Sequence, residues 1–229
     1  RFSDASEIEE LRIADNDEVD FSLQTRIASE FRTVRNILMK SNPKSLLITS
    51  LFEGEGKTFV GGNILKLISN SGKTAVVIDI NAEGKISRKL LSTASGNGIV
   101  DCLISDISVD SVIRQSSMKN ISIITPGTET GIMQEALANE KLQTILNALK
   151  EKFDVVVFIS GGVESNMTLP IVSDIVDKTL LVLRSNQLAK PYLKFYKLLK
   201  PQLNEDKMMV VVNGIKDYKI GCIKTLIKR

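Results

Sequence analysis

Short, almost wholly apolar runs recur along the chain, and helical patterns fill most of the gaps between them. The runs are Ser45–Ser50, Thr74–Asp79, Ile121–Thr125, Asp154–Ile159, Thr179–Arg184 and Met208–Asn213. A stretch such as VVVF, within the fourth run, is apolar at every position, which is typical of a strand buried on both faces. Helical periodicity is expected over Gln24–Met39, Thr58–Ser69, Gln134–Lys150, Leu169–Val176 and Ala189–Leu199. The alternation predicts an α/β fold, with a doubly wound, mostly parallel sheet between helices.

Charge and composition divide the chain into predicted segments. Residues 1–23 are expected to form an acidic, poorly ordered leader, because the first 20 residues contain eight acidic residues against two arginines. Residues 24–214 are expected to form one domain, and residues 215–229 a basic C-terminal tail. No apolar stretch reaches the roughly 18 residues that a membrane helix needs. The chain begins with Arg1 and has no secretory segment, which predicts that it is part of a longer protein.

The absence of histidine excludes several kinds of catalytic site. Without it there is no Ser-His-Asp triad, no Cys-His pair and no HExxH zinc site. Cys102 and Cys222 lie far apart with no CxxC spacing, so they predict free thiols rather than a zinc site or a disulfide framework. What remains is phosphate chemistry, which uses glycine, lysine, hydroxyl and carboxylate groups.

The segment LLITSLFEGEGKTF, Leu46 to Phe59, has the strand–loop–helix order of a phosphate-binding loop. Glycines allow backbone N–H groups to surround phosphate oxygens, and the helix start adds its own unpaired N–H groups. Lys57 would reach the β- and γ-phosphates, and the Thr58 hydroxyl would bind Mg²⁺. Leu51 departs from the standard pattern, which has glycine at that position. The predicted nucleotide-binding residues are Glu53, Gly54, Glu55, Gly56, Lys57, Thr58 and Phe59.

The form GEGKT, preceded by TS and by a helix reading EFRTVR, resembles the bacterial tyrosine kinases. These are cytoplasmic domains that accompany capsular and exopolysaccharide chain-length regulators. The resemblance spans roughly Arg26 to Gly214, and it includes VVIDIN at the second Walker-type motif and FDVVVFISGG at the Walker B strand. SDIVDKTLLVLR and VVVNGI match two later strands of the family.

The resemblance implies a P-loop NTPase fold with ATP or ADP and Mg²⁺ as cofactors. It implies catalytic roles for Lys57 and Asp79, metal binding by Thr58 and Asp79, and an oligomer interface at Arg32 and Arg35. The implied partners are other copies of the chain and a membrane-embedded polysaccharide chain-length regulator, or a membrane segment of the same polypeptide. The implied location is the cytoplasmic face of the bacterial inner membrane.

The chain departs from the family pattern around this site. Glu53 replaces a proline of the loop, and Gly161 and Gly162 replace two prolines after the Walker B strand. Acidic residues of the family are missing at Ser29, Asn81, Ile159 and Thr168, and Glu83 stands at an arginine position. An amide such as Asn81 cannot act as a general base, and losing a base costs roughly 10²–10⁴ in rate. These departures favour weakened or lost phosphoryl transfer, whereas Gly54, Gly56, Lys57 and Thr58 still allow nucleotide binding.

Several functions therefore stay open at this point. The chain is expected to be a nucleotide-binding regulatory or assembly module; the alternatives are an active tyrosine autokinase, a scaffold that binds no nucleotide, and a small-molecule ATPase. Tyr218, in a basic stretch, is the candidate phosphoacceptor. Nucleic acid is not an expected partner, because a pI near 8.8 is below the usual basic footprint of nucleic-acid-binding domains.

Overall fold

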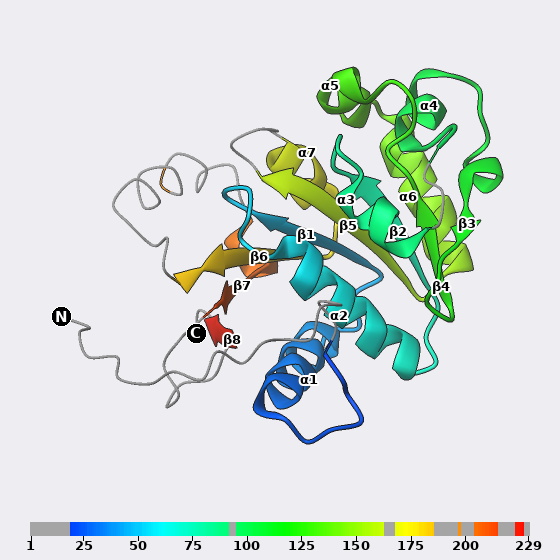
Figure 1. Ribbon diagram of the computed structural model, residues 1–229. Coiled ribbons are helices and arrows are strands. Elements are labelled where there is room, and N and C mark those ends of the chain that lie inside the picture. The colour runs from blue at the N-terminus through cyan, green and yellow to red at the C-terminus, as the bar shows by residue number, and fades with distance from the viewer. Residues whose placement is uncertain are drawn as a thin grey trace.

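The computed structural model describes residues 19–91, 95–162, 168–185, 197, 204–214 and 223–226. In this part of the chain the strands form one sheet, in the order β3-β4-β2-β5-β1-β6-β7-β8 (Figure 1). The interior strands, all parallel, are β4 (Ile121–Ile124), β2 (Ala75–Ile80), β5 (Val155–Gly162), β1 (Ser45–Ser50), β6 (Lys178–Arg184) and β7 (Met208–Asn213). The antiparallel edges are β3 (Arg114–Gln115) and β8 (Ile223–Leu226). The predicted α/β fold with a mostly parallel sheet is confirmed.

Helices cover both faces of the sheet (Figure 1). On one face lie α1 (Arg26–Met39), α2 (Lys57–Asn70) and α3 (Lys85–Leu90). The other face is covered by α4 (Ile99–Ile104), α5 (Met133–Leu137), α6 (Lys141–Lys152) and α7 (Thr168–Ile175). Short 3₁₀ helices are η1 (Val109–Val112), η2 (Thr130–Ile132) and η5 (Glu205–Lys207).

The apolar strand runs serve two separate cores. Leu46 and Ile48 of β1 belong to the core beneath α1, α2 and α3, while Leu47 between them belongs to the opposite core. Because successive side chains of a strand point to opposite faces, a strand covered on both sides must be apolar throughout. This is the physical reason why such runs predicted the strands.

Three helical regions differ from the sequence prediction or extend it. The helix predicted over Gln134–Lys150 is two helices, α5 and α6, and the Asn139 side chain accepts the Lys141 N–H (2.9 Å) at the start of the second. The short helices α3 and α4 were not predicted, and each begins after a glycine, Gly84 or Gly98. The helix predicted over 189–199 lies outside the described residues apart from residue 197.

Both terminal segments predicted from charge contribute described residues to the domain. Val19, at the end of the predicted leader, is buried, and its N–H donates to Asn63 Oδ1 of α2 (2.9 Å). Strand β8, within the predicted basic tail, pairs with β7. The three-segment division stays a prediction. Among the described residues, no helix is both long enough and apolar enough to cross a bilayer.

Candidate functional site

The predicted phosphate loop connects β1 to α2 at the carboxyl edge of the sheet. Strand β1 is central, with β5 on one side and β6 on the other, and the chain continues to β2 beyond β5. The strand order therefore reverses beside β1, and open α/β sheets bind their ligands at such a point, outside the carboxyl ends of the strands. The fold thus places the loop where a nucleotide would be expected.

Two glycines give the loop its backbone shape. Gly54 and Gly56 have φ angles of 76° and 95°, a region that side-chain-bearing residues rarely adopt. A Cβ on Gly56 would also lie 2.1 Å from Asn213 Nδ2. Directly after Gly56, α2 begins, and the first N–H groups of a helix have no partner within it. This is the geometry that binds phosphate oxygens at a helix start.

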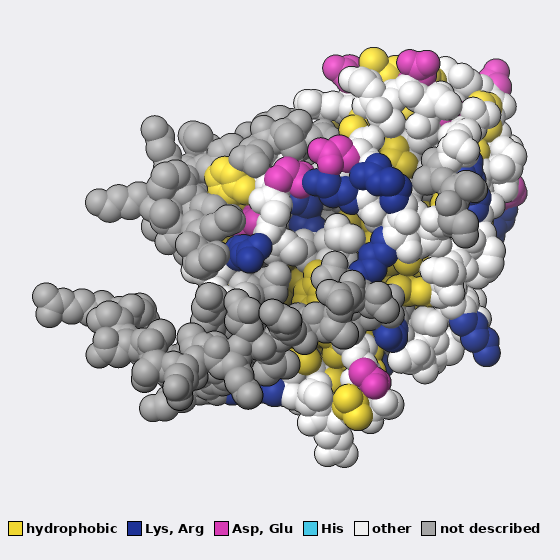
Figure 2. Space-filling model, in the orientation of Figure 1, with side chains coloured by type: hydrophobic (Ala, Val, Ile, Leu, Met, Phe, Trp, Pro, Cys, Tyr) yellow, Lys and Arg dark blue, Asp and Glu magenta, His cyan; other side chains and the backbone are white. Residues whose placement is uncertain are grey.

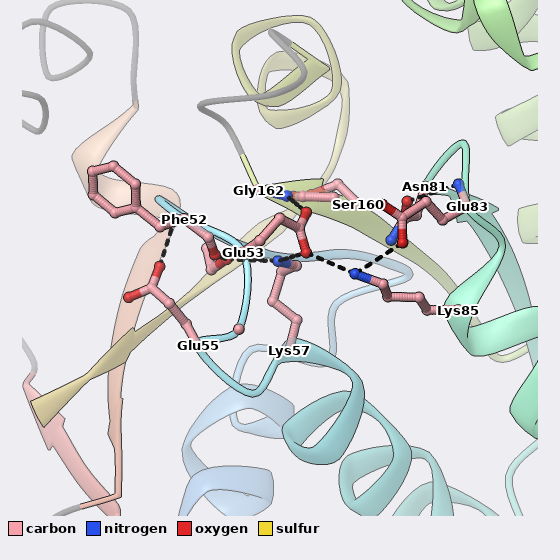
Figure 3. A network of polar contacts seen from close by, with 12 residues as sticks. Phe52, Glu53, Glu55, Lys57, Asn81, Glu83, Lys85, Ser160 and Gly162 are labelled. Carbon is pink, nitrogen blue, oxygen red and sulfur yellow. Dashed lines mark hydrogen bonds and ion pairs between the residues drawn. The ribbon is translucent and has the colours of Figure 1, made fainter. Parts of the chain in front are cut away.

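Polar contacts from β6 and β7 hold the outer side of the loop. Glu55 is fully buried, and its carboxylate accepts the N–H groups of Phe52 (2.7 Å) and Arg184 (3.0 Å). Asn213 Nδ2 donates to the Glu55 carbonyl (3.0 Å), and Arg184 Nη1 donates to the Gly54 carbonyl (3.0 Å). The predicted ligand-binding residue Glu55 thus points its carboxylate away from Lys57 (Figure 3). A contribution of Glu55 to a ligand would therefore come from its backbone N–H rather than from its carboxylate.

The side chain of Phe59 also lies away from the loop interior. It packs edge-on against Phe31 of α1, with ring centroids 5.6 Å apart. Thr58 is half-buried in the first turn of α2. A contribution of Phe59 to a ligand would therefore come from its backbone N–H, at the helix start.

The ammonium group of Lys57 lies inside the loop. Its Nζ donates to Ser50 Oγ (2.8 Å) and to the Phe52 carbonyl (3.4 Å), and it lies 3.5 Å from Glu53 Oε2. Burial lowers the pKa of Lys57, and the charge of Glu53 opposes this shift. The ammonium group therefore lies against Ser50 and Phe52, beside a carboxylate of the same chain.

That carboxylate, Glu53, lies between two lysines and a backbone N–H (Figure 3). Its Oε1 accepts the Gly162 N–H (2.5 Å), and its Oε2 is 3.2 Å from Lys85 Nζ. Burial opposes its ionisation, but the Gly162 N–H and the charges of Lys57 and Lys85 outweigh this, so the pKa of Glu53 is lowered. The group is therefore a carboxylate anion at neutral pH.

The acidic side of the site consists of residues from the end of β2. Asp79 is fully buried; its Oδ2 accepts the N–H (2.9 Å) and the hydroxyl (2.7 Å) of Ser87, and its Oδ1 accepts the Asn81 N–H (3.1 Å). Burial raises the pKa of Asp79, and these hydrogen bonds only partly oppose the shift. Asn81 Oδ1 accepts the Glu83 N–H (3.0 Å). In this arrangement Asp79 stabilises the first turn of α3.

No carboxylate takes the place of the missing Walker B acid among the described residues. Ile159 is paired with Asp79 across β2 and β5, is 2% exposed, and its Cδ1 would lie 3.0 Å from a Cβ on Gly61 of α2. Ser160 donates to Thr49 Oγ1 (2.6 Å), within the sheet. Thr168 is buried at the start of α7. Over the described part of the chain, no group of three or more Cys, Asp and Glu side chains could hold a metal ion.

The remaining predicted residues lie away from the loop or outside the described residues. Arg32 Nη2 donates to the carbonyls of Phe21 (2.6 Å) and Leu23 (3.5 Å), and Arg35 is half-buried one turn further along α1. Tyr218 lies outside the described residues. Sequence reasoning did not single out Lys85, Arg184 or Asn213. Their proximity to the loop comes from three different elements, and no local pattern marks it.

The chain is similar in sequence to bacterial tyrosine-protein kinases. It is 24% identical over 194 residues to CapB of Staphylococcus aureus, covering 83% of this chain and 85% of CapB. It is 23% identical over 167 residues to the tyrosine-protein kinase YwqD of Bacillus subtilis, covering 71% and 70%. The match to the tyrosine-protein kinase wzc of Salmonella typhi, 24% identical, covers 64% of this chain and only 20% of that protein. No family model matches the chain.

Solved structures show the same fold. The kinase domain of the Escherichia coli tyrosine kinase ETK superposes with a TM-score of 0.72 at 20% identity, covering 82% of this chain and 75% of that one. A cobyrinic acid a,c-diamide synthase from Mycobacterium smegmatis, solved with an ATP analogue and magnesium, gives a TM-score of 0.63 at 14% identity, covering 75% and 74%. The resemblance and the P-loop fold inferred from the sequence are thereby confirmed.

Proposed function

The chain is similar to bacterial tyrosine-protein kinases, and on that premise we propose that it is a nucleotide-binding domain whose phosphoryl transfer is weakened or lost. Its role is then in regulation or assembly, in a system that makes capsular or extracellular polysaccharide. The observation that carries the proposal is a contrast within one site. Lys57 and the loop glycines are arranged for phosphate, while Ile159 fills the core where the family has a metal-side acid.

The loop supports the nucleotide-binding part. Backbone N–H groups from Gly54 to Thr58 would surround the phosphates, with Lys57 supplying a positive charge. Glu55, Arg184 and Asn213 hold the loop from outside, so little rearrangement is needed on binding.

The acidic side supports the weakened-transfer part. Phosphoryl transfer depends on metal placement and on neutralising the developing charge. Thr58 and Asp79 are the oxygen ligands that we propose for Mg²⁺, which binds proteins through few carboxylates and keeps several waters. Because Asp79 Oδ2 already accepts two hydrogen bonds from Ser87 and Oδ1 accepts one from Asn81, its contact with the ion would run directly from Oδ1 or through water.

The decisive measurement is nucleotide binding by titration calorimetry on the whole chain. Wild-type protein is expected to bind ADP with a micromolar dissociation constant, and Lys57→Ala to weaken it at least about tenfold, since one lost charge-assisted contact is worth about 1.5–3 kcal/mol. Lys40→Ala, an exposed lysine after α1, is the control and should bind like the wild type. Absence of binding in the wild type would leave the scaffold alternative.

Phosphoryl transfer is tested separately with radiolabelled ATP and Mg²⁺. Wild-type protein is expected to incorporate no more label into tyrosine than Lys57→Ala does. Label that depends on Lys57 would contradict the proposal and establish the autokinase alternative, and Tyr218→Phe would then test the proposed phosphoacceptor.

The proposed partners follow from the relatives. We propose a membrane-embedded polysaccharide chain-length regulator, or a membrane segment of the same polypeptide, as the partner, because the resemblance to the bacterial tyrosine kinases implies one. The proposed location is the cytoplasmic face of the bacterial inner membrane. We also propose self-association through α1, at Arg32 and Arg35. Loss of oligomers in an Arg35→Ala variant, measured by sedimentation, would support that surface.

A further inference from the structure

We propose that Glu53 acts as an internal anion in the phosphate loop and makes the site select nucleoside diphosphates over triphosphates. The inference rests on the proposed nucleotide binding and names the ligand class that the same site prefers. The bacterial tyrosine kinases that the chain resembles usually have proline where this chain has Glu53. The proposed selectivity therefore concerns this chain and not the family.

Three hydrogen-bond donors from three elements converge on the Glu53 carboxylate. They are the Gly162 N–H at the end of β5 (2.5 Å), Lys85 Nζ at the start of α3 (3.2 Å) and Lys57 Nζ at the start of α2 (3.5 Å) (Figure 3). A bound phosphate is held in the same way, because its negatively charged oxygen atoms accept hydrogen bonds from lysines and backbone N–H groups. Glu53 therefore occupies the donors that a terminal phosphate beside Lys57 would use.

The backbone around Glu53 is shaped to make this contact. The pairing of β1 with β5 shifts register between Ile48 and Ser50, which brings Gly162 beside Ser50 and turns its N–H to the loop. A Cβ on Gly162 would lie 2.8 Å from the Glu53 nitrogen, so the approach requires glycine. A proline at position 162 would have no N–H to donate. The two departures from the family pattern, Glu53 and Gly162, are thus hydrogen-bond partners.

The Glu53 carboxylate would distinguish diphosphates from triphosphates by their charge. The N–H groups of the loop and of the α2 start would hold a diphosphate together with Lys57, and they are distinct from the Gly162 and Lys85 donors on Glu53. A third phosphate would meet a carboxylate of like charge whose donors are already engaged, and the interaction is screened only in part because the Glu53 side chain is 34% exposed. On the face shown in Figure 2, basic and acidic side chains lie against one another; the ion pairs of this site include Lys85–Glu53 and Lys85–Glu83.

The test is the dissociation constant of a non-hydrolysable ATP analogue divided by the dissociation constant of ADP, both measured by calorimetry without and with Mg²⁺. Wild-type protein is expected to bind ADP at least about tenfold more tightly than the analogue. Glu53→Gln keeps the shape and removes the charge, so it should lower that ratio about tenfold. Glu53→Ala frees the donors and should act in the same direction.

Glu83→Gln is the matched control, because Glu83 also pairs with Lys85 (3.0 Å) but is 61% exposed and does not contact Lys57 in the described structure. It should leave the ratio unchanged. Equal binding of both nucleotides by the wild type, or an unchanged ratio in Glu53→Gln, would overturn the inference while Lys57-dependent ADP binding upheld the proposed function. Nucleotide binding that appears only in the Glu53 variants would also overturn it, since Glu53 would then exclude diphosphates too. If neither the wild type nor a variant binds nucleotide, both proposals fail.

Discussion

Glu53 in the phosphate loop and Asp79 at the end of β2 both contribute carboxyl groups to the same site, but their surroundings shift the two pKa values in opposite directions. Glu53 faces two lysines and a backbone N–H, which lower its pKa despite its partial burial. Asp79 faces a hydroxyl and two backbone N–H groups in the core, and burial raises its pKa. The stabilised negative charge of Glu53 thus lies where a ligand's phosphate groups would bring further negative charge. At the end of β2 and in β5, by contrast, Asp79 and Ile159 are buried in the core.

The largest expected effect comes from restoring the missing acid. Ile159→Asp would bury a carboxylate between β5 and α2, against Gly61, and is expected to lower the free energy of unfolding by about 3 kcal/mol or more. Urea unfolding followed by circular dichroism measures it. Ile159→Val, which removes one methylene, should cost about 1 kcal/mol. Equal stability of Ile159→Asp and wild type would show that the acidic side still accommodates a charge there.

A matched pair of glycines tests the phosphate loop. Gly56→Ala is expected to lower the free energy of unfolding by about 2–3 kcal/mol, because it combines a positive φ with a clash that displaces Asn213 from the Glu55 carbonyl. Gly54→Ala has the positive φ but no atom within 4 Å of its Cβ, and should cost about 1 kcal/mol. Thermal unfolding compares the two. If Gly54→Ala is the more harmful variant, contacts from β7 do not hold the loop.

The smallest effect is a pH dependence at Asp79. Because its folded pKa is raised above its unfolded value, its contribution to stability is most favourable below the unfolded pKa and declines as pH rises through the folded pKa. The amide of an Asp79→Asn variant does not titrate in this pH range. The difference in free energy of unfolding between wild type and Asp79→Asn should therefore shrink as pH rises from about 4 to about 7. Urea unfolding at several pH values measures this difference, and a difference that grows with pH would mean that the folded protein stabilises the Asp79 charge.

Sequence reasoning was most successful where one local pattern determines the structure. The strand at Ser45–Ser50 is read from its apolar run, and the loop from two glycines followed by Lys57 and Thr58. It was less successful where a side-chain hydrogen bond to the backbone, which periodicity does not show, sets where a helix begins. Periodicity alone extended one helix from Gln134 to Lys150, whereas the chain breaks it between α5 and α6, where the Asn139 side chain accepts the Lys141 N–H. The short helix α3 has its first turn stabilised by Asp79, which lies in the preceding strand β2.

The sequence by itself determined the alternating elements, the position of the loop and the absence of acids at Asn81 and Ile159, because each depends on residue type and spacing. It presented Glu53 only as an unfavourable charge beside a phosphate. The tertiary structure decided that this charge has partners, since Gly162 and Lys85 reach it from β5 and α3, far along the chain. Charges interact through space, so only the folded arrangement shows whether a carboxylate is repelled or held.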